Sequence, residues 1–169
     1  MQPVIRDARP SDARRFEEIR LGGWKAAYVG MIDADYLAQL SVSDERIALW
    51  EERIRDATGR SVYLAAEQEG VVVGLAVLLD SRDDDVPDAA ELLALYIDPD
   101  RRSTGIGGLL MDAGFARMPQ PVQILWTLEG NAPARAFYER RGFATDGAQK
   151  VLDVPGQPLE VRYRRTRLG

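Results

Sequence analysis

The sequence predicts a mixed α/β sandwich, in which helices pack against a sheet. Three observations predict it: helical segments fill the first third of the chain, an apolar hairpin follows, and strands then alternate with helices. The 169 residues are enough for one domain with a substantial core. We see no internal repeat, low-complexity tract or long linker. We therefore expect a single domain over residues 1–169.

The first third begins with a candidate strand at Val4–Ala8 and continues with three helices, each preceded by a side chain able to cap it. The caps and approximate ranges are Ser11 for residues 12–22, Asp33 or Asp35 for a short helix ending at Leu40, and Ser43 for a helix in which Ile47, Trp50 and Ile54 repeat at helical spacing.

The remainder of the chain is predominantly apolar strands separated by turns and two helices. Gln68-Glu69-Gly70 lies between two such runs and predicts a hairpin. The expected strands are 61–67, 71–79, 91–97, 122–128, 143–152 and 158–167, and the expected helices are 106–118 and 131–142.

Composition excludes several classes of function. The chain has no cysteine and no histidine, so thiolate catalysis, Ser-His catalysis and zinc-thiolate sites are ruled out, and we expect no metal. Net charge is −5, which argues against a nucleic-acid partner. The sequence contains no run of 18 apolar residues, the length needed to span a membrane. Acidic residues and Arg6 interrupt the N-terminal segment, so it does not resemble a signal peptide. The expected location is cytoplasmic.

The segment Arg102-Ser103-Thr104-Gly105-Ile106-Gly107 is the most informative in the chain. It joins an apolar strand ending in Asp98-Pro99 to an apolar helix. Free N–H groups at a helix N-terminus bind phosphate, and glycines let a diphosphate approach the backbone. The segment lacks the lysine of a P-loop, and Leu110 replaces the third small residue of a dinucleotide fingerprint.

A second segment, Asn131 to Phe143, reads locally as a capped amphipathic helix. Asn131 is a suitable N-cap, Pro133 fits the first turn, and Gly142 suits a helix end. Residues 134, 137 and 141 share one face.

Together the two segments resemble the signatures of the GNAT superfamily of acetyltransferases: Arg-x-x-Gly-x-Gly, followed by Asn-x-x-Ala-x-x-Phe-Tyr-x-x-x-Gly-Phe. The resemblance spans nearly the whole chain and is sharp from Glu91 to Phe143. It implies a GNAT-like fold with a splayed central sheet, and acetyl-CoA as co-substrate. The residues that the resemblance assigns to this cofactor are Leu95, Tyr96, Ile97, Arg101, Arg102, Ser103, Thr104, Gly105, Ile106, Gly107, Gly108, Asn131 and Tyr138.

The resemblance also implies catalytic roles. Tyr138 matches the family's general-acid tyrosine, which protonates the departing thiolate; the alternative is an aromatic residue packed under the sheet. Glu91 begins the splayed strand, where many GNAT proteins carry a glutamate that acts as a base through water; the alternative is a solvated carboxylate at a strand end. Glu129 is a rival base, although its place before Asn131 favours a role at the helix N-terminus.

The acceptor pocket is expected in the first third of the chain. Trp24 and Tyr28 lie in a segment resembling one found in a bacterial GNAT group, and either wall a substrate pocket or only pack two helices together. The acidic loop Asp80–Asp88 either attracts a cationic acceptor or is a solvated, mobile loop.

The predicted function is transfer of an acetyl group from acetyl-CoA to a primary amine by direct attack in a ternary complex. The alternatives are a non-catalytic acyl-CoA-binding or sensor module, and a nucleotide-phosphate binder using only the glycine turn. The acceptor, a small molecule or a protein amine, is left open. A homodimer through the C-terminal strands rests on family analogy alone, so the oligomeric state is open too.

Overall fold

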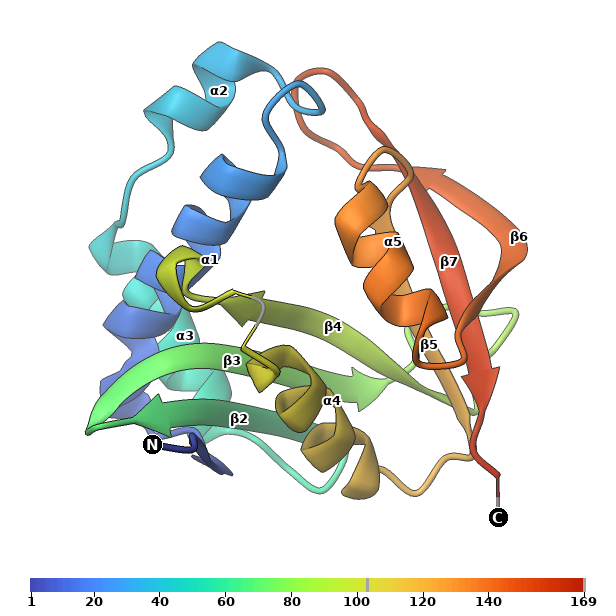
Figure 1. The fold of residues 1–169 in the computed structure, drawn as a ribbon, viewed down its shortest axis with the longest axis horizontal. Helices are drawn as coiled ribbons and strands as arrows, with labels where there is room; N and C mark the ends of the chain where they lie inside the picture. Colours follow the sequence, from blue (N-terminus) through green and yellow to red (C-terminus); the bar gives the residue numbers. More distant parts are fainter. Residues whose placement is uncertain (103, 169) are drawn as a thin grey trace.

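The computed structural model describes residues 1–102 and 104–168. Its centre is a seven-stranded mixed sheet with the strand order β1-β2-β3-β4-β5-β7-β6 (Figure 1). Among the strand pairings that the structure describes in this sheet, β4–β5 alone is parallel. The predicted α/β sandwich is confirmed. The strands are β1 (Val4–Asp7), β2 (Ser61–Gln68), β3 (Val71–Asp80), β4 (Ala89–Ile97), β5 (Val122–Leu128), β6 (Ala144–Val151) and β7 (Leu159–Thr166).

Helices cover both faces of the sheet. On one face α4 packs on β2–β4, and α5 adds Phe137 and Tyr138 to the same cluster beside β5 and β7. On the other face α1 and α3 bury a second cluster against β2 and β3 that includes Phe16 and Trp50. The helices are α1 (Ala13–Ala27), α2 (Ala34–Gln39), α3 (Asp44–Arg55), α4 (Ile106–Ala116) and α5 (Ala132–Glu139), with 3-10 turns at Pro10–Asp12 and Pro99–Arg101.

A bulge in β4 creates the opening in the sheet. Val77 of β3 pairs with Ala94 and Leu78 pairs with Leu92, so Leu93 is the extra residue. Before the bulge Ala90 and Leu92 face the α4 side, and after it Leu95 and Ile97 do so. Uninterrupted alternation would place Glu91 and Leu95 on the same face of the strand. Because of the bulge, they lie on opposite faces.

Beyond the bulge, β4 diverges from β5. Residues Ala89–Leu92 pair with Val122–Leu125, and the described residues that follow on the two strands do not pair with each other. Figure 1 shows the strands meeting near the C-terminus and separating toward α5. The outer edge of residues 93–97 is thereby left open, while the inner edge stays bonded to β3.

Helix α1 starts later and ends later than the sequence predicts. Asp12, not Ser11, precedes it, and the buried Asp12 carboxylate accepts from the Arg9 amide and the Arg6 guanidinium instead of capping α1. The helix also passes through Gly22 and Gly23 to Ala27. A Cβ on Gly23 would lie 3.1 Å from the Tyr96 ring, so glycine permits close packing on β4 here and does not end the helix.

Other predicted boundaries fall within a few residues of the observed ones. Asp33 and Ser43 cap their helices through side-chain oxygens, and Glu69 and Gly70 form the hairpin turn with positive φ. Helix α4 ends at Ala116 and not at Met118, because the amides of Arg117 and Met118 bond to carbonyls three residues back and tighten the chain.

Candidate active site

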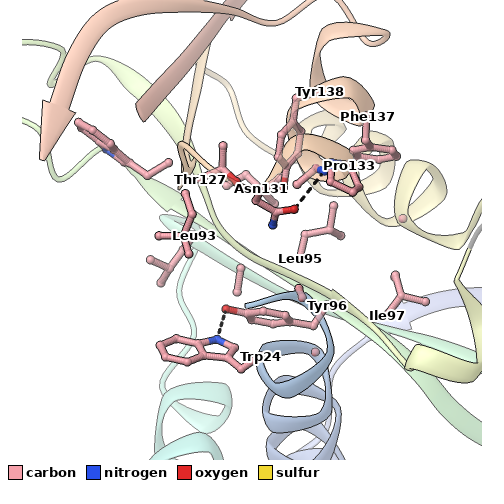
Figure 2. A pocket seen from close by; sticks show the side chains of 18 of the residues that line it. Trp24, Leu93, Leu95, Tyr96, Ile97, Thr127, Asn131, Pro133, Phe137 and Tyr138 are labelled. Atoms are coloured by element: carbon pink, nitrogen blue, oxygen red, sulfur yellow. Dashed lines mark hydrogen bonds between the residues drawn. The ribbon is translucent and has the colours of Figure 1, made fainter. Parts of the chain in front are cut away.

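The opening between β4 and β5 leads into a cavity of about 1290 Å³. Figure 2 shows Tyr138, Asn131 and Phe137 on one side, Trp24 and Tyr96 on the other, and Leu93 and Leu95 of β4 between them. Both residues expected to be catalytic and nearly all those assigned to the cofactor line this one space. The cofactor set on the wall is Leu95, Tyr96, Ile97, Arg101, Arg102, Thr104, Gly105, Ile106, Gly107, Asn131 and Tyr138. Gly108 is not on the wall, and Ser103 lies outside the described residues.

The N-terminus of α4 presents free amides to the cavity. Gly105 adopts φ +84°, a conformation that favours glycine, and its carbonyl accepts the first helical hydrogen bond from Leu109 at 3.2 Å. The amides of Ile106, Gly107 and Gly108 precede that bond, so they have no acceptor within the helix. The helix dipole adds partial positive charge, and this end of the cavity is therefore suited to an anion.

Three arginines surround this helix end. Arg101 donates to the Gln68 side chain at 3.2 Å, and Arg102 donates to the Gly23 carbonyl at 3.4 Å. Arg141, which the sequence argument did not single out, lies on Gly108 with its guanidinium 4.8 Å from the centre of the Phe137 ring. A Cβ on Gly108 would overlap that guanidinium. Gly108 thus makes room for Arg141, a different reason from the predicted approach of a diphosphate.

Helix α5 positions Asn131 and Tyr138. The Asn131 side chain accepts from the Ala134 amide at 3.4 Å, as expected of an N-cap. The Tyr138 ring packs against Phe137, Phe143 and Tyr163, with centroids 5.3 to 6.2 Å apart. No hydrogen bond between described residues uses the Tyr138 hydroxyl. Burial raises the pKa of Tyr138 above 10.0, so the phenol stays protonated and able to donate.

Glu91 is buried at the start of the cavity, so the alternative of a solvated carboxylate is wrong. Its side chain is 2% exposed and both of its oxygens accept from Arg82. The Arg82 amide adds a third hydrogen bond, at 3.2 Å. These contacts with Arg82 hold the Glu91 carboxylate in place and tie the two ends of segment 82–91 together.

Trp24 and Tyr28 both line the cavity and pack between elements. The Trp24 indole donates to the Tyr96 hydroxyl at 3.0 Å, and its ring lies 5.2 Å from that of Tyr28. They join an apolar cluster that links the end of α1 to Leu128 of β5 and Leu152 after β6. Trp24 and Tyr28 therefore fit both interpretations of the sequence, because they line the pocket and also pack between elements of the fold.

Arginines pair with three of the five aspartates of the acidic loop and so anchor it, while Asp84 and Asp88 are exposed. Arg162 of β7 is 4% exposed and binds Asp83 and Asp85 of the loop together with Asp146 of β6. Asp83 also accepts from the Trp126 indole at 2.9 Å. The loop is therefore held against the C-terminal strands by ion pairs, and Asp83 is not free to attract an acceptor. Nothing in the sequence around Arg162 indicates that it pairs with aspartates so far away in the chain.

The end of the cavity opposite Arg101 and Arg102 contains residues that the sequence argument missed. Glu160 of β7 stands opposite Lys150 of β6 and Leu128 of β5 in the strand register, so these residues share one face of the sheet. Trp126 lies two residues before Leu128, and the Lys150 ammonium is 4.1 Å from the centre of its ring. The alternation of side chains between the two faces of the predicted strand 158–167 was the one sequence signal that could have placed Glu160 on this face.

Two further features bear on the kind of site. Among the described residues, no group of three or more Asp, Glu, His or Cys side chains is arranged to hold a metal ion. No helix in the described part of the chain has the length and apolarity to cross a membrane.

Comparison with known proteins identifies the family. The acetyltransferase (GNAT) family matches residues 29–143. The chain belongs to the GNAT acetyltransferase family. A probable N-acetyltransferase of Mycobacterium tuberculosis is 31% identical over 147 residues, covering 85% of this chain and 80% of the relative. The predicted resemblance is confirmed, and the splayed β4 and glycine turn described above are those of a GNAT protein.

Solved GNAT structures share the fold. The PaiA N-acetyltransferase of Thermoplasma acidophilum, solved in complex with coenzyme A, has a TM-score of 0.73 and 23% identity, over 96% of this chain and 98% of that one. A putative acetyltransferase of Salmonella typhimurium, solved with acetyl-CoA, has a TM-score of 0.71 and 20% identity, over 100% of this chain and 96% of that one.

Proposed function

We propose that this protein transfers the acetyl group of acetyl-CoA to a primary amine by direct attack, with both substrates bound together in the cavity. As a GNAT protein with an N-acetyltransferase relative, the chain is an acetyl-CoA-dependent N-acetyltransferase. The observation that carries the finer proposal is the open edge of β4 beyond its bulge, leading to the free amides of α4 within one cavity.

The two ends of the cavity suit the two ends of the acyl carrier. Amides at the start of α4 would bind the diphosphate, and Arg101 and Arg141 would add charge-assisted contacts. The pantetheine arm carries amides, and the unpaired edge of residues 93–97 offers it backbone partners. Two similar structures were solved with coenzyme A or acetyl-CoA, which supports this assignment.

Direct attack needs stabilisation of an oxyanion and of a leaving thiolate. Backbone N–H groups on the open edge of β4 are suitable donors for the oxyanion. Tyr138 is the proposed acid for the thiolate, because its free hydroxyl lies in the cavity and burial keeps it protonated. We assign Glu91 a positioning role, since Arg82 already holds both of its oxygens.

The first test measures cofactor preference. Acetyl-CoA at about 100 times its Kd is expected to stabilise the protein by about 2.7 kcal/mol, which raises Tm by roughly 5–10 °C for a domain of this size. ATP and NAD, which contain adenosine and a diphosphate as coenzyme A does but lack its pantetheine arm, should give a smaller rise at the same concentration. Equal or larger shifts with ATP or NAD would indicate a nucleotide-phosphate binder instead.

The second arm of the same test measures turnover. Release of free thiol from acetyl-CoA is followed with benzylamine, tyramine, putrescine and glycinamide as acceptors. Amine-dependent thiol release supports the proposal. Tight acetyl-CoA binding with slow hydrolysis that no amine accelerates would favour the non-catalytic acyl-CoA-binding module.

A further inference from the structure

Glu160 is a half-buried carboxylate on the cavity wall without a cation bound to it. No Lys or Arg nitrogen of the described residues lies within 4.0 Å of its oxygens, whereas Glu91 on the same wall is fully paired. Buried carboxylates are normally paired or hydrogen-bonded, because removing their charge from water is costly. An uncompensated carboxylate facing a substrate cavity therefore calls for a ligand that supplies the missing cation.

The groups facing Glu160 come from several elements of the fold. Lys150 of β6 stands opposite Glu160 in the strand register, and Arg82 of the acidic loop, Glu91 of β4, Tyr28 and Tyr96 line the same cavity. Burial raises the pKa of Glu160 above its ordinary value; Lys150 and Arg82 lower it, and Glu91 raises it further. Burial is thus only partly offset by the two cations.

Tyr28 lines the same cavity as Glu160 and the proposed acid, Tyr138. Burial is the largest cause that raises the pKa of Tyr28, and the charges of Tyr96, Tyr138 and Glu160 add to it. Tyr28, Tyr96, Tyr138 and Glu160 all line this one cavity. The same cavity is walled by the apolar and aromatic side chains of Leu93, Trp24 and Trp126.

We propose that Glu160 binds the ammonium group of the acceptor and takes its proton, making Glu160 the general base. The inference rests on the proposed function and deepens it: the acceptor is a primary amine that enters the cavity as a cation. Both oxygens of the Glu91 carboxylate accept hydrogen bonds from Arg82, whereas both oxygens of the Glu160 carboxylate are available to a ligand.

Each proton and each bond is accounted for in the proposed reaction. The acceptor R-NH₃⁺ gives one proton to the Glu160 carboxylate and becomes R-NH₂, whose lone pair forms a C–N bond with the thioester carbonyl. The tetrahedral oxyanion collapses, the C–S bond breaks, and the thiolate takes the Tyr138 proton. The protonated amide nitrogen returns a proton to the Tyr138 phenolate, and Glu160 releases its proton to solvent. The sum is amide, free thiol and one proton.

The test is the pH dependence of kcat/KM for the best acceptor among benzylamine, tyramine, putrescine and glycinamide. The wild type should show a plateau near neutrality, because ionised Glu160 accepts a proton from the ammonium form. Glu160→Gln can use only the free amine, so its kcat/KM should rise about tenfold per pH unit up to the pKa of the acceptor, which is about 10.4 for a lysine-like amine and about 8 for an α-amino group. At pH 7 its kcat/KM should be at least about 100-fold lower.

Glu129→Gln is the matched control, since Glu129 is an exposed carboxylate next to β5 and off the cavity wall. It should keep the plateau. An unchanged plateau in Glu160→Gln, or a loss of rate that is equal at every pH, would overturn the assignment of Glu160 and leave the proposed function standing. Acetyl-CoA binding without turnover of any amine in the wild type would contradict the proposed function, and the inference would fall with it.

Stability provides an independent readout. Folding raises the pKa of Glu160 above its ordinary value of 4.5. Ionisation of this carboxylate as the pH rises above 4.5 therefore lowers the stability of the folded state. Glu160→Gln should therefore have a Tm at pH 7.5 equal to or above that of the wild type, and this advantage should shrink as the pH falls toward 4.5. A marked drop in Tm at pH 7.5 would indicate a structural role for the carboxylate and contradict the proposal.

Discussion

Replacing Tyr138 by phenylalanine is expected to lower kcat by about 100-fold or more and to leave the Kd for acetyl-CoA unchanged. The substitution removes the hydroxyl and keeps the ring that packs against Phe137 and Phe143. Burial holds the pKa of Tyr138 above 10.0, so the wild type should not lose this acid between pH 7 and 9. Steady-state kinetics with calorimetric titration of acetyl-CoA measures both quantities.

Tyr163→Phe is the control for the loss of a phenol hydroxyl from the same aromatic cluster. The Tyr163 hydroxyl accepts from Arg135 and donates to Glu139, both at 2.8 Å, and it is not on the cavity wall. Its loss should cost about 1 kcal/mol of stability and spare kcat. Unchanged kcat in Tyr138→Phe would remove Tyr138 from the mechanism.

Arg162→Met is expected to give the largest loss of stability, about 3 kcal/mol, or roughly 6–12 °C in Tm. Arg162 compensates Asp83 and Asp146, whose side chains are only 18% and 17% exposed. Methionine would leave both carboxylates without their cation. Because Asp83 also accepts from the Trp126 indole, the acceptor end of the cavity should loosen and the KM for the amine should rise. Urea denaturation and kinetics test the two effects.

Arg60→Met removes another arginine from a pair with an aspartate of the same loop. Arg60 is 83% exposed and binds Asp80, so the loss should stay below about 1 kcal/mol. If the free energies of unfolding of Arg162→Met and Arg60→Met differ by less than about 1 kcal/mol, the Arg162 cluster does not hold the loop.

Most of the fold was predictable because local signals agreed with it. The capping side chains of Asp33, Ser43 and Asn131 mark helix starts, and Glu69-Gly70 marks the hairpin. The start and end of α1 were not predictable. Gly22 and Gly23 read locally as a helix end, and only the close approach of β4 explains why the helix continues.

The end of the cavity at the start of α4 was predictable to a similar extent, because a short glycine segment sets its backbone amides. The acceptor end was not, since it is assembled from residues far apart in sequence. Arg82 pairs with Glu91 across a loop, and Glu160 and Tyr28 come to the same cavity from opposite ends of the chain. Long-range charge pairing leaves no spacing pattern in the chain, and a lone acid in a strand is ordinary.

The most direct test of the account is an NMR titration of the ¹⁵N-labelled protein with acetyl-CoA. We expect saturable binding, with the largest amide shifts at Thr104–Gly108 of the turn and α4 and at Leu95–Ile97 on the open edge of β4. Absence of binding, or shifts confined to residues away from both segments, would contradict the claim that the splayed strand and the helix start hold the acyl carrier.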